Sequence, residues 1–477
     1  MSLSSDKENH DTKTIHFVSL GCAKNRVDTE VMLGVSDEEG YRLVGSPEEA
    51  EVIVVNTCGF IGPAKKESIE TILEMAQYKE EGQCERLVVA GCLSQRYPEE
   101  LARELPEVDH LLGSSDMLAL SKVLRREAER MLVGNPANWT IRASDPRRLS
   151  LGGPSAYVKI AEGCNRSCSF CAIPGIRGKQ RSREVADLVM EATRLAEQGV
   201  VELNLVSQDT IAYGRDLEGR PDLATLVEAL TEVPGIRWIR LHYLYPERLD
   251  ERLIELMASH PKVLPYIDMP LQHASDGVLR AMRRGHGGDR LYRLVDRVRE
   301  AIPGLVFRTT FLVGHPGETD EAFEELLEFV RYAEFDHVGV FTYSPEEGTR
   351  AHGMEADVPP AVARKRQRKL MSVQRAISRE RLRARIGHEV EVLVTGPSEE
   401  SEYLLEGRFY GQAPEVDGKV ILANGEAEIG EIRRALVINA SDYDLVADLL
   451  TRDGVWDPPP GTRRPRKRKV RLRTLPT

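Results

Sequence analysis

The chain has 477 residues, which is too long for one ordinary domain. Of these residues 41% are hydrophobic and 30% charged, a composition typical of globular proteins. No run of about 18 apolar residues is present, so we expect no membrane span. The first 14 residues lack the apolar core of a secretory signal, so we expect a cytoplasmic protein. Seven cysteines in such a compartment do not suggest a disulfide scaffold.

The first segment repeats one pattern three times: an apolar strand, a cysteine and then a helix. Strands are predicted at residues 15–20, 52–55 and 87–90, and the cysteines that follow them are Cys22, Cys58 and Cys92. Repeated βα units form parallel sheets, and the carboxyl ends of parallel strands share one edge, where ligands bind. We therefore expect the three cysteines to meet at that edge.

Residues 136–154 contain several Pro and Gly breakers and are predicted to be a linker. The segment that follows alternates strands and helices. Its predicted strands are at residues 157–161, 202–206, 238–244, 266–269, 306–313 and 337–343. Six βα units predict an open or partial barrel of parallel strands, with the chemistry at the C-terminal strand ends.

The last third begins with a predicted basic helix at residues 361–385 and continues with short strands separated by glycines. That pattern predicts a small antiparallel barrel. A second basic run, Arg463–Arg473, lies in a tail that we expect to be disordered. The net charge of the whole chain is −11, so these two basic blocks stand out from an acidic protein. Such blocks favour contact with nucleic acid or a ribonucleoprotein. The alternative is a solvated helix face and a disordered tail.

Cys164, Cys168 and Cys171 form a C-x₃-C-x₂-C loop after the first strand of the middle segment. Three close thiolates can bind three irons of a 4Fe–4S cube, which leaves the fourth iron open for a small molecule. The alternative is structural zinc, which needs a fourth Cys or His ligand. Because no histidine occurs between His110 and His242, the loop lacks a local fourth ligand, and we predict an iron–sulfur cluster.

The loop closely resembles the motif of radical S-adenosylmethionine (SAM) enzymes, including the aromatic Phe170 before the third cysteine. The resemblance implies that this cluster binds SAM at its open iron and cleaves it, so that its three cysteines are catalytic. Residues after the middle strands hold the methionine and ribose parts of SAM in such enzymes. The predicted cofactor-binding residues are Phe170, Gln208, Gln272 and Glu318. For the last three the alternative is an ordinary turn or strand cap.

Cys22, Cys58 and Cys92 resemble the N-terminal domain of the methylthiotransferase family, where such cysteines bind a second 4Fe–4S cluster with one open iron. The alternative is three buried cysteines at strand ends, and Cys84 lies outside both sets. Residues 406–418 resemble the TRAM domain, a small barrel often used for RNA contact. Phe409 and Tyr410 offer rings that could stack on a base, unless they belong to the core.

The resemblance covers residues 13–453 and implies an α/β chain with a defined order of domains. The expected parts are a parallel βα domain (13–128), a partial (βα)₆ radical SAM barrel (150–381), a TRAM-like antiparallel β-barrel (384–453) and a basic disordered tail (454–477).

Two branches of the methylthiotransferases share this layout. One modifies a tRNA adenosine, and the other modifies the β-carbon of an aspartate in protein twelve of the small ribosomal subunit. In this chain Ala-Lys-Asn follows Cys22, whereas the tRNA branch typically has Gln-Met-Asn after its first cysteine. These residues, together with the runs 171–178 and 343–349, resemble the second branch, the RimO family.

That resemblance implies that SAM serves both as radical source and as methyl donor, and that two 4Fe–4S clusters are present. The hydrogen of the aspartate β-carbon is removed by the radical, and a methylated sulfur from the N-terminal cluster takes its place. The implied partners are the ribosomal protein, free or within the ribosome, an electron donor, and rRNA through the TRAM-like barrel and basic tail. A tRNA adenosine methylthiotransferase and a non-enzymatic iron–sulfur RNA-binding protein remain the alternatives.

Overall fold

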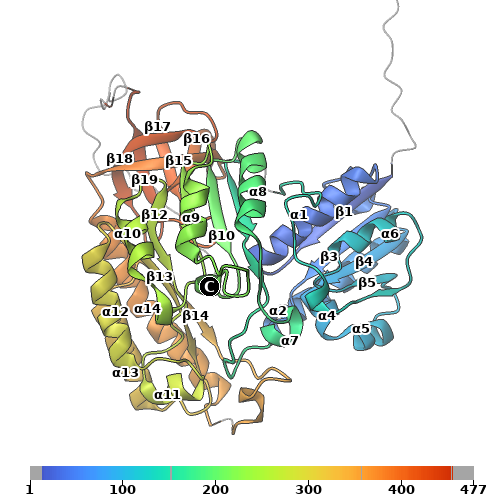
Figure 1. Cartoon of the computed structure of the whole chain (residues 1–477), viewed down its shortest axis with the longest axis horizontal. Coiled ribbons are helices and arrows are strands. Elements are labelled where there is room, and N and C mark those ends of the chain that lie inside the picture. Colours follow the sequence, from blue (N-terminus) through green and yellow to red (C-terminus); the bar gives the residue numbers. More distant parts are fainter. Residues whose placement is uncertain (1–12, 151–152, 356, 453, 455–477) are drawn as a thin grey trace, which may run out of the picture.

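The computed structural model describes residues 13–150, 153–355, 357–452 and 454, which form three consecutive units, each built around its own sheet (Figure 1). The first unit lies beside the second, and the third covers one end of the second. The basic run Arg463–Arg473 lies outside the described residues. Within the described part, every helix is too short or too polar to cross a membrane.

The first unit is a sheet of six parallel strands in the order β2-β1-β3-β4-β5-β6. Its strands are β1 (Thr14–Ser19), β2 (Arg42–Leu43), β3 (Val52–Thr57), β4 (Arg86–Gly91), β5 (His110–Leu112) and β6 (Met131–Leu132). Its main helices are α1 (Ala23–Glu38), α2 (Gly62–Ala76), α4 (Cys92–Arg96), α5 (Pro98–Glu104) and α6 (Leu120–Leu124). The two central strands, β3 and β4, are buried along their whole length, as expected for a parallel sheet covered on both faces.

The second unit is an open barrel whose six strands are all parallel to their neighbours, in the order β14-β13-β12-β11-β10-β7. Its strands are β7 (Ser155–Lys159), β10 (Glu202–Val206), β11 (Trp238–Leu241), β12 (Val263–Asp268), β13 (Val306–Val313) and β14 (His337–Thr342). The covering helices are α8 (Val185–Glu197), α9 (Leu223–Thr231), α10 (Glu251–Ser259), α12 (Gly288–Ala301), α13 (Asp320–Ala333) and α14 (Pro360–Arg383). The predicted partial (βα)₆ barrel is confirmed.

The third unit is a closed five-stranded barrel in the order β15-β16-β17-β19-β18. Its strands are β15 (Glu389–Ser398), β16 (Ser401–Phe409), β17 (Val420–Asn424), β18 (Ile432–Ala440) and β19 (Leu445–Leu449). The predicted antiparallel pairing holds except between β17 and β19. Because β18 crosses over to pair with β15, β17 and β19 come to lie side by side in parallel.

A buried ion cluster joins the third unit to the second at the N-terminal ends of the barrel strands. Glu202, the first residue of β10, pairs with Arg240 of β11 at 2.9 Å and with Arg408 of β16 at 2.5 Å. Burial opposes the ionisation of Glu202, but the charges of the two arginines hold its pKa well below its usual range. An ion pair with this burial requires both partners, since either one alone would be an uncompensated charge.

Asp417 forms a second link at the same end. Its carboxylate accepts a hydrogen bond from Tyr266 (2.6 Å) and pairs with Arg308 (2.7 Å). Phe409 is buried, with only 1% of its surface exposed. Of the two rings considered for stacking on a base, Phe409 therefore belongs to the core, which confirms the alternative for this residue. The Tyr410 hydroxyl donates to the carbonyl oxygen of Gly304 (2.7 Å). The TRAM-like unit therefore closes the bottom of the barrel.

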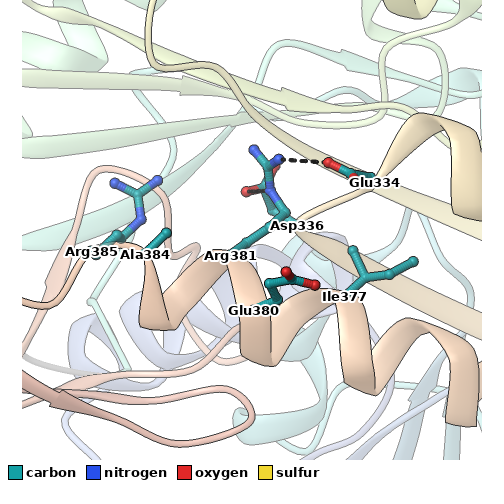
Figure 2. A pocket seen from close by; sticks show the side chains of 7 residues that line it. All are labelled: Glu334, Asp336, Ile377, Glu380, Arg381, Ala384 and Arg385. Carbon is teal, nitrogen blue, oxygen red and sulfur yellow. Dashed lines mark hydrogen bonds and ion pairs between the residues drawn. The ribbon is translucent and has the colours of Figure 1, made fainter.

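The basic helix α14 uses much of its charge within the chain. Its ion pairs include Arg366–Asp320, Lys369–Glu324, Arg379–Asp442 and Arg381–Asp336. Near its C-terminal end lies a surface hollow of about 400 Å³ (Figure 2). The residues lining it are Glu334, Asp336, Ile377, Glu380, Arg381, Ala384 and Arg385. The mixture of three acids and two arginines is not the uniformly positive surface that favours nucleic acid.

Replacing Glu202 with Gln should leave the guanidinium groups of Arg240 and Arg408 buried without a counter-charge. We expect the free energy of unfolding to fall by roughly 3–5 kcal/mol, measured by urea denaturation of the metal-free protein. Arg252→Gln, which breaks the exposed ion pairs of Arg252 with Asp222 and Glu228, is the control and should change little. Equal effects of the two substitutions would contradict the importance of this cluster.

Candidate functional site: two sets of three cysteines

Cys22, Cys58 and Cys92 lie at the carboxyl ends of three neighbouring strands. Cys22 is the N-cap of α1 after β1, Cys58 follows β3 directly, and Cys92 is the first residue of α4 after β4. Because β1, β3 and β4 are adjacent in the sheet, the three cysteines share one sheet edge.

Two glycines allow the loops that carry these cysteines to approach closely. A Cβ atom on Gly91, which has a φ of +99°, would lie 2.3 Å from Asn56 Oδ1. A Cβ atom on Gly59 would lie 2.7 Å from the carbonyl oxygen of Cys92. Any side chain at either position would push the strand ends apart, so glycine is required by the space available.

Asn25 connects the loops that follow all three strands. Its amide nitrogen donates to the carbonyl oxygens of Leu20 (3.1 Å) and Thr57 (2.9 Å). Its side-chain oxygen accepts from the thiol of Cys92 at 3.6 Å. One buried side chain therefore fixes the relative positions of the three cysteine-bearing loops.

Burial and neighbouring thiols affect the ionisation of Cys58 and Cys92. Burial, with smaller contributions from the charges of Cys92 and Cys22, raises the pKa of the Cys58 thiol to about 12. Burial also raises the pKa of Cys92, against the opposing charge of Arg177. Cys22 is exposed. Cys58 and Cys92 therefore stay protonated at neutral pH in the metal-free protein, and a bound metal must displace these protons.

The second set, Cys164, Cys168 and Cys171, lies on a loop after the short strand β8 (Ala161–Glu162) and just before α7 (Ile173–Arg177). The backbone amide of Cys164 donates to the carbonyl oxygen of Gly178 (3.0 Å). Ser169, between the second and third cysteines, donates its backbone amide to Met282 (3.0 Å) and accepts from Ala351 (2.7 Å). These contacts fix the loop at the C-terminal end of the barrel.

Two arginines help to fix this loop, Arg166 from within it and Arg284 from outside it. Arg284 approaches the sulfur of Cys168 at 3.5 Å and donates to the carbonyl oxygen of Pro270 (2.7 Å). The guanidinium groups of Arg284 and Arg166 both lie over the ring of Tyr245, at 4.1 and 3.6 Å from its centre. Burial raises the pKa of Cys164 to about 11 and that of Cys171 to about 12.

The residues predicted to contact SAM also follow strands of the barrel. Gln208 comes after β10, and its amide donates to Glu162 at 2.6 Å. Gln272 comes after β12 with a φ of +73°, and its backbone amide donates to Thr310 (2.8 Å). Glu318 comes after β13 and pairs with Arg366 at 3.4 Å. Phe170 packs beside a small apolar cluster that includes Val278 and Met282.

Several polar atoms near these strand ends are buried and form no hydrogen bond among the described residues. They are Gln208 Oε1, Asp209 Oδ1, His273 Nε2 and Glu318 Oε1, of which the last two lie 3.7 Å apart. Buried polar atoms are almost always partnered in native proteins, so these atoms fit a polar ligand such as the amino-acid and ribose groups of SAM.

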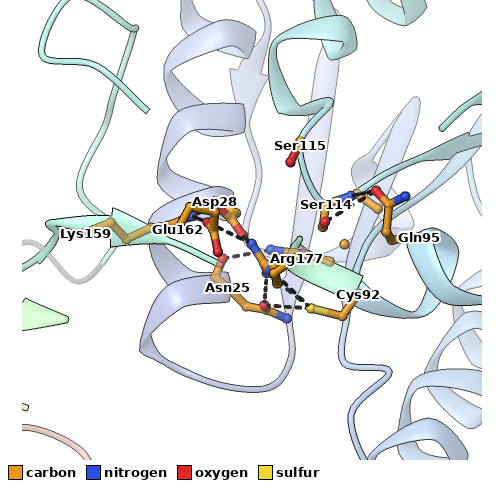
Figure 3. Close-up of polar contacts among 12 residues, drawn as sticks. Asn25, Asp28, Cys92, Gln95, Ser114, Ser115, Lys159, Glu162 and Arg177 are labelled. Atoms are coloured by element: carbon orange, nitrogen blue, oxygen red, sulfur yellow. Dashed lines mark hydrogen bonds and ion pairs between the residues drawn. The ribbon is translucent and has the colours of Figure 1, made fainter. Parts of the chain in front are cut away.

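A buried layer of opposite charges lies beside Cys92, where the first unit meets the barrel (Figure 3). Asp28 of α1 pairs with Lys159 of β7 (2.7 Å) and with Arg177 of α7 (2.8 Å). Glu162 pairs with the same two cations and also accepts from Gln208. The side chains of the four charged residues are at most 2% exposed, so the layer joins the first unit to the barrel through balanced charge.

No role for these four charged residues is predicted from the sequence. The available signal was a lysine inside the apolar strand of residues 157–161 and an arginine at the end of the run 171–178. Charged residues are seldom fully buried unless they are paired, so each required a partner that the sequence could not identify.

Lys24 lies beside the first set of cysteines, at the seam between the two units. Its ammonium nitrogen lies 3.5 Å from the centre of the Tyr243 ring. Burial would lower the pKa of Lys24, but the charges of Tyr243 and Cys22 keep it above its usual value. No carboxylate among the described residues forms an ion pair with Lys24, which leaves a cation next to the exposed cysteine.

The residues of both sets suit iron–sulfur clusters. All seven cysteines of the chain are free thiols, and each set contributes three. No group of three or more His, Cys, Asp or Glu side chains in the described part of the chain is arranged to hold a single metal ion. That finding does not argue against a four-iron cube, because a cube is larger than a single ion and places its thiolates farther apart. N–H donors directed at the cysteine sulfurs are also typical of iron–sulfur sites.

Three family profiles match successive parts of the chain. The Radical SAM superfamily matches residues 158–330, the Uncharacterized protein family UPF0004 matches residues 14–113, and the TRAM domain matches residues 386–450. Among solved structures, the radical S-adenosylmethionine methyltransferase TsrM from Kitasatospora setae is similar in fold, with a TM-score of 0.51 and 16% identity, over 70% of this chain and 77% of that one.

Similarity to whole proteins is much higher. The chain is 61% identical to the ribosomal protein uS12 methylthiotransferase RimO of Sorangium cellulosum, over 98% of each chain. It is 51% identical to the protein of the same name from Myxococcus xanthus, over 92% of each chain. With this identity over nearly the full length of both proteins, the chain belongs to the RimO family of radical SAM methylthiotransferases.

Proposed function

We propose that this protein adds a methylthio group to the β-carbon of an aspartate in ribosomal protein uS12, in the cytoplasm. The observation that carries the proposal is the presence of two sets of three free cysteines at the facing edges of two joined units. The family relationship supports the substrate, since the relatives named above carry uS12 in their names.

Cys164, Cys168 and Cys171 would hold one 4Fe–4S cluster, with Gln208, Gln272 and Glu318 as candidate contacts for SAM. When reduced, such a cluster together with SAM supplies a radical that can remove hydrogen from an unactivated carbon. A radical is physically reasonable here because a C–H bond on a saturated carbon is not acidic enough for a side-chain base. Arg284 and Arg166 keep the loop in place through their contacts with Tyr245.

Cys22, Cys58 and Cys92 would hold a second 4Fe–4S cluster. When bound, it supplies an iron position at which a sulfur atom can be held and methylated. Asn25 orients the three loops, and the exposure of Cys22 leaves this side of the site open to a substrate. An external electron donor completes the reaction, and RNA contact through the TRAM domain remains a prediction.

Lys24 is suited to bind the carboxylate of the target aspartate. It carries a positive charge next to Cys22, faces Tyr243 and has no carboxylate partner among the described residues. The tRNA branch typically has methionine at this position, and its substrate is an adenosine, which has no carboxylate. A cation that forms no ion pair with a carboxylate among the described residues is therefore useful for an acidic side chain and not for a nucleobase.

The proposal is tested by offering small ribosomal subunits and bulk tRNA in parallel to the protein reconstituted with iron and sulfide, with SAM and a reductant. Mass spectrometry should find a methylthio group on one aspartate of uS12. A methylthio group on tRNA adenosine alone would retain the chemistry but overturn the substrate. A protein that consumes no SAM would instead favour the non-enzymatic alternative.

Replacing Lys24 with Met should raise the KM for uS12 roughly ten- to a hundredfold, because a hydrogen bond to a charged group is lost. SAM cleavage without substrate should be unchanged. Lys13→Met, at another lysine that lies over a tyrosine ring of the same unit, is the matched control and should leave KM as it is. An unaltered KM in the Lys24 variant would remove this residue from the substrate site.

A further inference from the structure

Arg177 connects the two sets of cysteines. It is the last residue of α7, a helix that starts two residues after Cys171. Its side chain reaches the other unit, where Nε and Nη2 donate to the sulfur of Cys92 at 3.3 and 3.2 Å (Figure 3). The same helix is held against the first unit by the hydroxyl of Ser114, which donates to the carbonyl oxygen of Ile176 (3.1 Å).

The direction of this guanidinium is fixed by its remaining partners. Nη2 also donates to Asn25 Oδ1 (2.7 Å), and Nη1 donates to Asp28 (2.8 Å) and Glu162 (3.2 Å). Arg177 is 1% exposed, so water cannot take the place of these partners. A planar guanidinium held by carboxylates on one side therefore presents two N–H groups to the sulfur on the other side.

Hydrogen bonds to cysteine sulfur and nearby positive charge both influence the reduction potential of an iron–sulfur cluster. They stabilise the reduced form more than the oxidised form, because the reduced cluster carries more negative charge. Burial strengthens the effect, since the local dielectric constant is low. Among the three cysteines of the N-terminal set, the described residues place an arginine hydrogen bond only on Cys92.

We propose that Arg177 is a positioning residue that holds the Cys92 sulfur and raises the reduction potential of the cluster bound by Cys22, Cys58 and Cys92. The inference rests on the proposed second cluster. Because Arg177 belongs to the loop that follows the radical SAM cysteines, the electronic properties of the N-terminal cluster then depend on the docking of the two units.

The test uses the full chain with Cys164, Cys168 and Cys171 all replaced by Ala, reconstituted with iron and sulfide under anaerobic conditions. Iron content and the midpoint potential are measured, the latter by a redox titration followed by electron paramagnetic resonance. Arg177→Gln should shift the potential to a more negative value. Arg177→Lys, which keeps the charge but loses the planar pair of donors, should give a smaller shift in the same direction.

Arg147→Gln is the matched control. Arg147 is also buried at the seam and pairs with Glu30 of α1 (2.6 Å) and with Glu191 of α8, but among the described residues it forms no hydrogen bond with a cysteine. Its substitution should destabilise the same seam but leave Arg177 against the Cys92 sulfur, so the potential should not shift. A shift equal to that of Arg177→Gln would show that docking alone sets the potential, and would overturn the direct role of Arg177.

The remaining outcomes are also decisive. An unchanged potential in both Arg177 variants, with iron retained, would overturn this inference and leave the proposed function intact. If Arg177→Gln loses iron while its circular dichroism stays native and Arg147→Gln keeps iron, the positioning role is supported. If Arg177→Gln does not fold, the potential of Arg177→Lys decides. A parent protein without iron would overturn the second cluster, and this inference with it.

Discussion

The arrangement of the whole molecule depends on one layer of buried opposite charges between the first unit and the barrel. Two cations, Lys159 and Arg177, face two anions, Asp28 and Glu162, and all four are nearly inaccessible to water. Removing any one of them leaves an uncompensated buried charge, which costs several kcal/mol. Because each of these charges needs its partners, the layer fixes α1 of the first unit against β7 and α7 of the second.

The same principle operates at the opposite end of the barrel. There Glu202 is held between Arg240 and Arg408, and Asp417 binds Arg308 and Tyr266. The TRAM-like unit thus closes the N-terminal ends of the strands, while the chemistry lies at their C-terminal ends. The barrel is fixed at both ends by polar contacts, and its apolar core lies between the strands and the covering helices.

Much of this architecture could be predicted from the sequence, because its strands are apolar and its cysteines recur at strand ends. The strands β2, β5 and β6 were missed because they have only two or three residues each. Residues 136–154, predicted to be a linker, include the buried Ile141 and the seam residue Arg147. Pro and Gly mark the ends of regular structure, but they do not show whether the segment between them is packed.

The charges at the seam could not be predicted for a different reason. Asp28 lies 131 residues before Lys159 and 149 before Arg177, and no local pattern shows that residues so far apart will meet. In the sequence, Lys24 differs from the residue typical of the tRNA branch, and no other feature marks it. Its proposed role depends on the position of its ammonium group between Cys22 and Tyr243, which only the folded chain shows.

The central claim is that the two sets of cysteines hold two clusters with separate tasks. The most direct test compares Cys168→Ala with Cys58→Ala after reconstitution, with 5′-deoxyadenosine and methylthiolated product measured in the same reaction. We expect Cys168→Ala to form neither. We expect Cys58→Ala to form deoxyadenosine without methylthiolated product. Deoxyadenosine from Cys168→Ala, or full product from Cys58→Ala, would contradict the account.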